Sequence, residues 1–321
     1  MPSITLANIA WSTPGGDAVL SDLDLIFQPE RTGIVGRNGV GKSTLLRLLT
    51  GELAPASGTI AIDGSTALLR QTVRVQPGET IADLFSARTG LALLRKAEAG
   101  DASADEIGDA DWTLEARIDE ALATIGLPLA ADTPLDRLSG GQRTRAALAG
   151  AIFAAPDFLL LDEPTNNLDR DGRAAVRDLL RSWRGGAIVV SHDRELLEDM
   201  DAIVELTALG AARYGGGWSA YRTRKDIEQA AAEAELAGAE KRLDHARRQA
   251  QATTEKQDRR DAGGRRKAAR GDMPKIVIGG LKRRAEETRA AATRLADRQR
   301  GEAEQTLESA RGRIEIVDPF S

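Results

Sequence analysis

Short apolar runs, each separated from the next by polar or helix-like sequence, mark the first two thirds of the chain. They predict strands at residues 4–10, 24–27, 32–35, 59–62, 67–70, 158–161, 187–190, 202–206 and 211–214. Apolar residues at helical spacing predict helices at 45–49, 116–125, 145–153 and 172–183. The run 158–161 is apolar throughout, which is typical of a strand buried in a parallel sheet. The pattern predicts an α/β fold.

Residues 80–133 have a mainly helical pattern, within which the polar stretch 100–111 predicts a loop. The three glycines at 215–217 predict a flexible boundary, so we expect one domain over 1–217.

The pattern changes after this boundary. Residues 219–257 are rich in Ala, Glu, Arg and Gln, and 275–312 have a similar composition, with few large aliphatic side chains in either stretch. Each predicts a helix about 50 Å long at 1.5 Å per residue. The segments DAGG at 261–264 and GDMP at 271–274 interrupt the pattern, so we expect an antiparallel helical hairpin over 218–313 with its tip near 264–274. Residues 314–321 are expected to begin a following segment.

The net charge of −5 conceals an uneven distribution. Residues 218–313 contain 24 Lys and Arg against 16 Asp and Glu, and within them 256–284 contain 11 against 3. Such an excess at the predicted tip favours contact with a phosphate backbone, although a merely solubilising tip remains the alternative. The candidate contact residues are Arg265, Arg266, Lys267, Arg270 and Lys275.

Composition excludes several classes of site. The chain has no cysteine, which excludes disulfides and thiolate metal sites, and its two histidines cannot form a histidine-rich metal site. No apolar run of about 18 residues predicts a membrane span. We therefore expect a protein of the cytoplasm.

The sequence GRNGVGKST at 36–44 lies between a predicted strand and a predicted helix. Glycines at 36, 39 and 41 let the backbone turn sharply and direct N–H groups toward a phosphate, at the positive end of the helix. Lys42 can then reach the β and γ phosphates of a nucleotide, and the Ser43 hydroxyl can ligate Mg²⁺.

Polar side chains follow three other predicted strands. Asp162 and Glu163 come directly after the buried run, where one carboxylate can hold Mg²⁺ and the other can polarise an attacking water. His192 follows 187–190 and is placed to contact a γ phosphate. Gln71 ends the strand at 67–70, where it can reach Mg²⁺ and sense the water, or be a solvated surface residue.

A second anion site is predicted where Ser139, Gly140, Gly141 and Gln142 open a helix, because Ser139 can cap it and the glycines leave N–H groups bare. One chain needs a single site for each γ phosphate, so we expect this one to serve a nucleotide held by another unit. Trp11 has two interpretations, an aromatic that stacks on adenine or an edge-strand residue of the core.

With these residues in place, 1–217 resembles an ATP-binding cassette domain. GRNGVGKST resembles its Walker A loop, LSGGQ its signature and FLLLDEP its Walker B strand, while Gln71 resembles its Q-loop and His192 its switch histidine. The resemblance implies a parallel core sheet with an antiparallel portion from the N-terminal strands, ATP and Mg²⁺ as cofactors, and adenine stacking by Trp11. The implied ATP-binding residues are Trp11, Gly36, Asn38, Gly39, Gly41, Lys42, Ser43 and Thr44, with Ser43, Gln71 and Asp162 at the metal and Glu163, His192 and Gln71 in catalysis.

The segments TNNLD, SHDREL and YGGGWSAY resemble subfamily F, whose soluble members act on ribosomes and join two cassettes through a helical linker. Asn167, where the subfamily commonly has histidine, and the short stretch 80–111 depart from its pattern. The resemblance implies a partner cassette, contact of the linker with ribosomal RNA or transfer RNA, and slow hydrolysis by a single cassette.

Three alternatives stay open at this point. The chain is compatible with the ATPase subunit of a membrane transporter, although a basic hairpin after the last strands is hard to explain there. A half-size cassette that forms a homodimer is the second. The third, a chromosome-maintenance ATPase, would carry its coiled coil between the phosphate loop and the signature, whereas this hairpin follows His192.

Overall fold

The computed structural model describes residues 1–71, 75–166, 168–208, 210–268 and 275–317. The chain divides into two compact units, one formed by Met1–Thr223 and the other beginning at Arg224. Among the described residues, no helix combines the length and the apolar character needed to cross a membrane.

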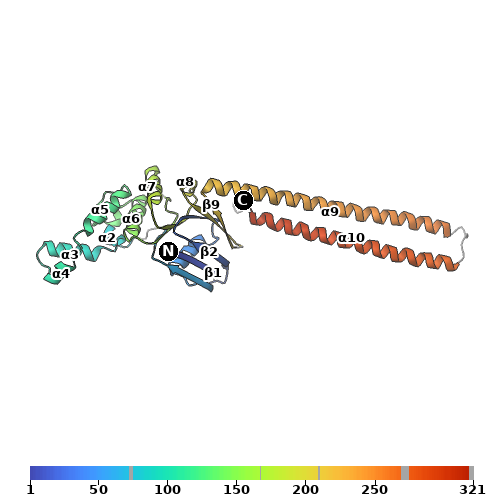
Figure 1. Cartoon of the computed structure of the whole chain (residues 1–321), viewed down its shortest axis with the longest axis horizontal. Coiled ribbons are helices and arrows are strands. Elements are labelled where there is room, and N and C mark those ends of the chain that lie inside the picture. The colour runs from blue at the N-terminus through green and yellow to red at the C-terminus, as the bar shows by residue number, and fades with distance from the viewer. Residues whose placement is uncertain (72–74, 167, 209, 269–274, 318–321) are drawn as a thin grey trace. The chain divides into compact units, whose positions relative to one another are not determined.

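The first unit contains two sheets (Figure 1). The larger has the strand order β5-β6-β7-β3-β8-β9, built from β5 (Thr66–Leu69), β6 (Phe158–Asp162), β7 (Gly186–Val190), β3 (Arg31–Val35), β8 (Ala202–Thr207) and β9 (Gly210–Gly215). Its strands are parallel except β9, which runs antiparallel to β8. The smaller sheet is antiparallel, with β1 (Ser3–Ser12) between β2 (Ala18–Phe27) and β4 (Ser57–Asp63). The predicted fold class, with a parallel core and an antiparallel N-terminal portion, is confirmed.

Alternate residues of the central strands enter two different cores, as the twofold period of a strand requires. Phe158 and Leu160 pack with the smaller sheet and with α1 (Lys42–Leu49) on one face. Leu159 and Leu161 belong to the core on the other face, to which most of the other helices of the unit contribute. Burial on both faces explains why this strand is apolar throughout.

The first unit contains seven further helices before α9 in its described residues. They are α2 (Ile81–Leu84), α3 (Arg88–Glu98), α4 (Ala104–Asp109), α5 (Leu114–Thr124), α6 (Gly140–Phe153), α7 (Arg170–Ser182) and α8 (Arg194–Glu198), with a 3-10 turn at Leu135–Arg137. The loop predicted at 100–111 is wrong because it contains α4. Ser103 and Glu106 form a capping box that stabilises this helix, although none of its residues is buried.

The turn at 215–217, where we predicted a flexible boundary, is closely packed. The Gly216 N–H donates to the Asp201 carbonyl at 2.8 Å, and Gly216 has a φ of 91°. A Cβ on Gly217 would lie 2.3 Å from the Glu198 carbonyl oxygen, so only glycine fits this approach.

Two long helices, α9 (Trp218–Ala268) and α10 (Lys275–Val317), lie side by side and form the predicted hairpin (Figure 1). Leu243 and Ala239 of α9 pack with Leu307 and Ala310 of α10. The helices contain 51 and 43 residues, about 75 and 65 Å at 1.5 Å per residue, and so are longer than predicted. Gly263 lies inside α9, which shows that glycine did not end this helix as expected; residues 269–274 of the predicted tip lie outside the described residues.

Candidate functional site

The parallel strands bring four polar segments to one edge of the larger sheet. β5, β6, β7 and β3 are neighbours in that order, so their carboxyl ends share an edge. Gln71, Glu163 and His192 follow β5, β6 and β7, and the loop at 36–41 follows β3. Val190 pairs with both Asp162 and Ile34, which fixes the register of the three central strands. The edge has the position at which α/β sheets bind ligands.

Glycine is required at both ends of this loop. Gly36 has a φ of 153°, and a Cβ there would lie 2.3 Å from the Leu206 carbonyl oxygen. Gly41 has a φ of 106°, and a Cβ there would lie 2.8 Å from a Leu20 methyl group. Gly39, with a φ of 84°, has open space beside it. The loop is therefore packed at its two ends and open at its middle, where Asn38 and Gly39 are exposed.

The Lys42 amine lies inside the loop and binds two of its carbonyl groups. Its Nζ donates hydrogen bonds to the carbonyl oxygens of Gly36 at 2.7 Å and Arg37 at 3.0 Å, and the residue is 7% exposed. Burial lowers the pKa of this amine, while the charges of Glu163 and Asp162 act in the opposite direction. A buried cation among exposed loop amides suits an anion such as a phosphate.

Ser43 and Asp162 form a pair of oxygen donors next to the loop. The Ser43 hydroxyl, at an exposed position in the first turn of α1, bonds to the Asp162 carboxylate. Burial raises the pKa of Asp162, which this bond and Lys42 oppose. Hydroxyl and carboxylate oxygens are ligands that Mg²⁺ accepts, with further positions filled by substrate phosphates. The described residues contain no group of three or more acidic or histidine side chains that holds a metal alone.

Glu163 and His192 meet at the same edge. The Glu163 carboxylate accepts from the His192 backbone N–H at 3.4 Å and lies 3.4 Å from the His192 Nε2 atom. Glu163 has a φ of 50°, an uncommon conformation, and its N–H donates to the Val190 carbonyl at 2.8 Å. Strained backbone of this kind occurs often at functional sites.

The environment alters the ionisation of both groups. Burial raises the pKa of Glu163, and the charge of Asp162 adds to the rise against the effects of the His192 N–H and Lys42. Burial, then the charge of Lys42, lowers the pKa of His192 below 6.5. The imidazole is therefore neutral at pH 7 and able to donate one hydrogen bond and accept another.

Three further predicted site residues make no polar contact with residues 36–41 within the part of the chain that the structure describes. Gln71 is exposed, two residues beyond β5, and within the described parts of the chain no hydrogen bond connects it to Asp162 or Ser43. Thr44 is half-buried in α1. Trp11 is half-buried on β1 opposite Leu20, the residue that touches Gly41, and it packs against the core of that face. Both interpretations of Trp11 therefore stay open.

The signature residues form a helix cap, as predicted for Ser139. The Ser139 hydroxyl accepts from the Gln142 N–H at 3.2 Å, and the Gln142 side chain accepts from the Ser139 N–H at 2.9 Å. Ser139 and Gly140 are exposed. In the described ranges, no hydrogen bond or ion pair joins this cap to residues 36–44. Gln142 was predicted as an anion contact, but its side-chain oxygen is engaged by the cap.

Sequence reasoning missed the backbone groups that shape the site. The Val190 carbonyl accepts a hydrogen bond from the Glu163 N–H. The Leu206 carbonyl lies so close to Gly36 that it leaves no room for a side chain at the start of the loop. Neither residue type carries a signal of this role, because any apolar side chain in that strand offers the same carbonyl.

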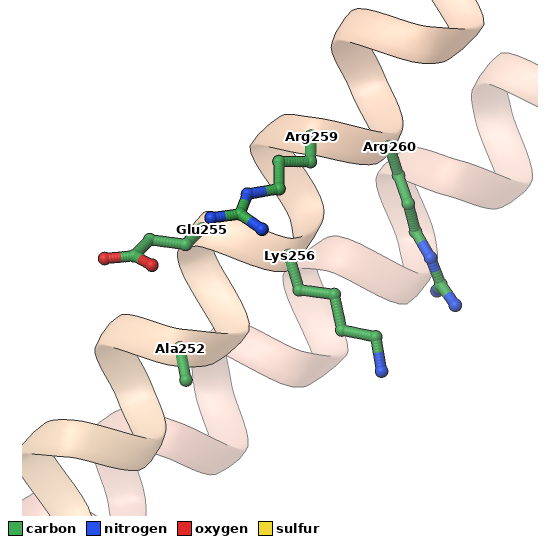
Figure 2. A pocket seen from close by; sticks show the side chains of 5 residues that line it. All are labelled: Ala252, Glu255, Lys256, Arg259 and Arg260. Atoms are coloured by element: carbon green, nitrogen blue, oxygen red, sulfur yellow. The ribbon is translucent and has the colours of Figure 1, made fainter.

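A cluster of cations lies on α9 within the basic stretch 256–284, just before the predicted tip at 264–274. Lys256, Arg259 and Arg260, which we call the shaft cluster, line one shallow hollow with Ala252 and Glu255. Figure 2 shows Lys256 and Arg260 extending in the same direction, with Arg259 turned toward the side of Glu255. Among the residues that the structure describes, no carboxylate forms an ion pair with this cluster.

Other cations of the hairpin do form such pairs. Arg248, Arg298 and Arg300 each contact a carboxylate one helical turn away, at 3.0, 3.1 and 2.9 Å. Of the candidate contact residues at the tip, Arg266 is exposed on α9 and Arg270 lies outside the described residues. Arg265 and Lys267 lie in α9 and Lys275 begins α10, and the structure does not describe their side chains.

The chain matches one protein family, and it is similar both to proteins named for resistance or translation and to proteins named for transport. The family described as "ABC transporter" matches residues 20–166. The chain is 37% identical over 268 residues to the tylosin resistance ATP-binding protein TlrC of Streptomyces fradiae, a match that covers 75% of this chain and 49% of that protein. It is 34% identical over 234 residues to the energy-dependent translational throttle protein EttA of Mycobacterium tuberculosis, covering 66% and 42%.

Transport proteins are matched as well. The biotin transport ATP-binding protein BioM of Rhizobium etli is 32% identical over 198 residues, covering 59% of this chain and 84% of that protein. A solved ATP-binding subunit of an ABC transporter has a similar fold, with a TM-score of 0.54 at 19% identity over 66% of this chain and 89% of the other. The chain spans about half the length or less of the first two relatives, and most of the length of the last two.

Proposed function

The chain belongs to the ATP-binding cassette family, and from this premise we propose that it binds ATP with Mg²⁺ and hydrolyses the γ phosphate. The observation that carries the proposal is the convergence of Lys42, Asp162, Glu163 and His192 on one sheet edge, with the ionisation described above. Members of the family are ATPases.

Each residue has a distinct proposed role. Lys42 and the loop amides bind the phosphates, exchanging the carbonyl contacts of Lys42 for phosphate oxygens. Ser43, Asp162 and Gln71 hold Mg²⁺, which when bound neutralises charge on the β and γ phosphates. The Glu163 carboxylate accepts a proton from the attacking water, and His192 donates a hydrogen bond to the γ phosphate.

The pKa of Glu163 gives a prediction for the pH dependence of turnover. The proposed base acts only when ionised, and burial raises its pKa, so the rate should fall on the acid side at a higher pH than an exposed glutamate would cause. The acid limb should therefore lie above pH 4.5, the ordinary value. Steady-state phosphate release at saturating ATP measures this limb, with circular dichroism confirming that the fold persists. A flat rate down to pH 4.5 would contradict the assignment.

The signature cap is proposed to act on a second cassette. Its exposed N–H groups at the start of α6 suit an anion, and within the described residues it makes no polar contact with the loop of its own chain. We propose that ATP binds between two cassettes, in tandem or as a homodimer, with Ser139, Gly140 and Gly141 contacting the nucleotide of the partner.

The finer proposal is a subfamily F protein of the cytoplasm that acts on the ribosome, with the hairpin contacting ribosomal RNA or transfer RNA. A relative named for translational throttling supports it, and so does the shaft cluster, which has no carboxylate partner among the described residues of the hairpin. A cation with no carboxylate partner is available to a phosphate backbone, whereas a paired one must first lose its partner. The second candidate, a transporter ATPase, is favoured by the match to the biotin transport protein.

Charge reversal of the shaft cluster distinguishes the two candidates. We expect Lys256→Glu, Arg259→Glu and Arg260→Glu together to weaken binding to ribosomes by about tenfold or more, since each phosphate contact releases counterions. The matched control reverses Arg248, Arg298 and Arg300, which changes the charge of the same hairpin equally but alters paired cations. Co-sedimentation with ribosomes and AMP-PNP over a series of salt concentrations measures both.

The two candidate functions predict different results in this experiment. The ribosome proposal expects weak binding by the shaft variant, near-normal binding by the control, and binding of the unmodified chain that falls with added salt. Equal binding by the shaft variant and the control would reject the cluster as an RNA contact. No binding of the unmodified chain at low salt would favour the transporter candidate.

A further inference from the structure

Helix α8 begins directly after the proposed γ-phosphate contact. Asp193, the next residue after His192, caps this helix, since its carboxylate accepts from the N–H groups of Glu195 at 3.0 Å and Leu196 at 3.3 Å. Leu196 and Leu197 are buried in the core. His192 is therefore followed directly by the capping residue of a short helix whose apolar side chains are buried in the core.

The same helix holds the first turn of α9. The backbone N–H and the hydroxyl of Ser219 both donate to one oxygen of the Glu198 carboxylate, at 2.8 and 2.9 Å. The guanidinium of Arg194 lies 5.6 Å from the ring centre of Trp218, a distance at which cation–π attraction acts. The Glu198 carboxylate thus binds one of the N–H groups that a helix leaves unsatisfied at its N-terminus.

A second contact joins this turn to the strands behind the phosphate loop. Tyr221 is fully buried, and its hydroxyl donates to the Glu205 carboxylate at 3.0 Å. Glu205 lies on β8 directly opposite Val35, the residue before Gly36. The first turn of α9 therefore contacts the helix that follows His192 and the strand that pairs with the one leading into the phosphate loop.

We propose that Glu198 and Trp218 are positioning residues that couple occupancy of the nucleotide site to the start of α9. They hold α8, and with it His192, next to Glu163; in return, a γ phosphate that fixes His192 orders the first turns of α9. The coupling must be equal in both directions, because linkage between two sites is reciprocal. This inference rests on the proposed function, since it requires that the chain binds ATP.

Hydrogen exchange of the full chain with and without Mg²⁺ and AMP-PNP tests the coupling. We expect the nucleotide to slow amide exchange in 36–49, at the phosphate loop, and by about fivefold or more in 218–230, at the start of α9. Glu198→Ala should abolish the effect in 218–230 while leaving it in 36–49. Glu198→Gln, which keeps an acceptor for Ser219, should restore it, and Trp218→Ala should behave as Glu198→Ala does.

Glu195→Ala is the matched control, because Glu195 lies on α8 as well but forms its ion pair with Arg177. It should keep the full effect in 218–230. An unchanged nucleotide effect in Glu198→Ala, or slowing in 36–49 of the unmodified chain without any in 218–230, would overturn the coupling and leave the proposed function intact. Absence of slowing in both segments would overturn ATP binding and the coupling together.

Discussion

Replacing Glu163 with glutamine is expected to lower ATP turnover by about a hundredfold or more while ATP affinity changes by about threefold at most. Glutamine has the shape of glutamate but cannot accept a proton from water. Its amide oxygen can still accept from the His192 N–H, the contact that the carboxylate makes now at 3.4 Å. The variant should therefore bind ATP and retain it.

The position of Glu163 leaves little room for another base. Its N–H bond to the Val190 carbonyl and its uncommon φ of 50° fix the backbone, and the side chain is mostly buried beside His192. Asp162 is the nearest alternative, but its carboxylate is bonded to Ser43, so it is proposed to serve the metal instead. A general base contributes about a hundredfold to ten-thousandfold to a rate, which sets the expected loss.

Phosphate release under saturating ATP measures turnover, and retention of labelled ATP after rapid gel filtration measures binding. The control is Glu195→Gln, which removes the same charge from an exposed residue three positions beyond His192. It should turn over ATP at the normal rate. If Glu163→Gln hydrolysed ATP as fast as this control, the assignment of the base would be wrong.

The sequence predicted those features that depend on neighbouring residues alone. Runs such as 158–161 and 187–190 are apolar because both faces of their strands are buried, so their positions were found to within about one residue. The phosphate loop and the cap at Ser139 were also predicted, since glycine spacing and a capping residue are local signals. The site residues reach one edge because parallel strands share their carboxyl ends.

Features that depend on tertiary contacts were not predicted. The ties between α8 and α9 join residues about 20 positions apart, through side chains such as Ser219 and Glu198 that read as ordinary surface residues. Gly263 continues a helix that its propensity disfavours, because a long run of helix-forming residues surrounds it. Helix α4 lies in a polar stretch without apolar periodicity, so its capping box was the one local signal from which it could have been predicted.

Replacing Lys42 with methionine should weaken ATP binding by about a hundredfold or more, because hydrogen bonds from a cation to phosphate each contribute about 1.5–3 kcal/mol. The stability of the nucleotide-free chain should respond in the opposite sense, or hardly at all. Lys42 is 7% exposed, and burial of its amine costs free energy, which its two carbonyl contacts only partly offset. Methionine fills similar space without a charge.

The pH dependence of stability shows whether this cost is present. Because burial lowers the pKa of Lys42 in the folded state, the unfolded chain binds more protons in the window between that pKa and the ordinary 10.5. The contribution of Lys42 to the free energy of unfolding of the unmodified chain should therefore increase as the pH rises through this window. In Lys42→Met this gain should be absent.

Chemical denaturation over a pH series and fluorescent-ATP titration measure the two effects on the same samples. Arg47→Met is the matched control, since Arg47 lies in the last turn of α1 with an exposed side chain that pairs with Glu52. Its loss removes an equal charge from the same helix and should leave ATP affinity unchanged, because the guanidinium faces solvent rather than the loop carbonyls. If Lys42→Met bound ATP as well as this control, Lys42 would be rejected as the phosphate contact. If Lys42→Met were markedly less stable than the unmodified chain without nucleotide, the amine would instead have a structural role in the loop.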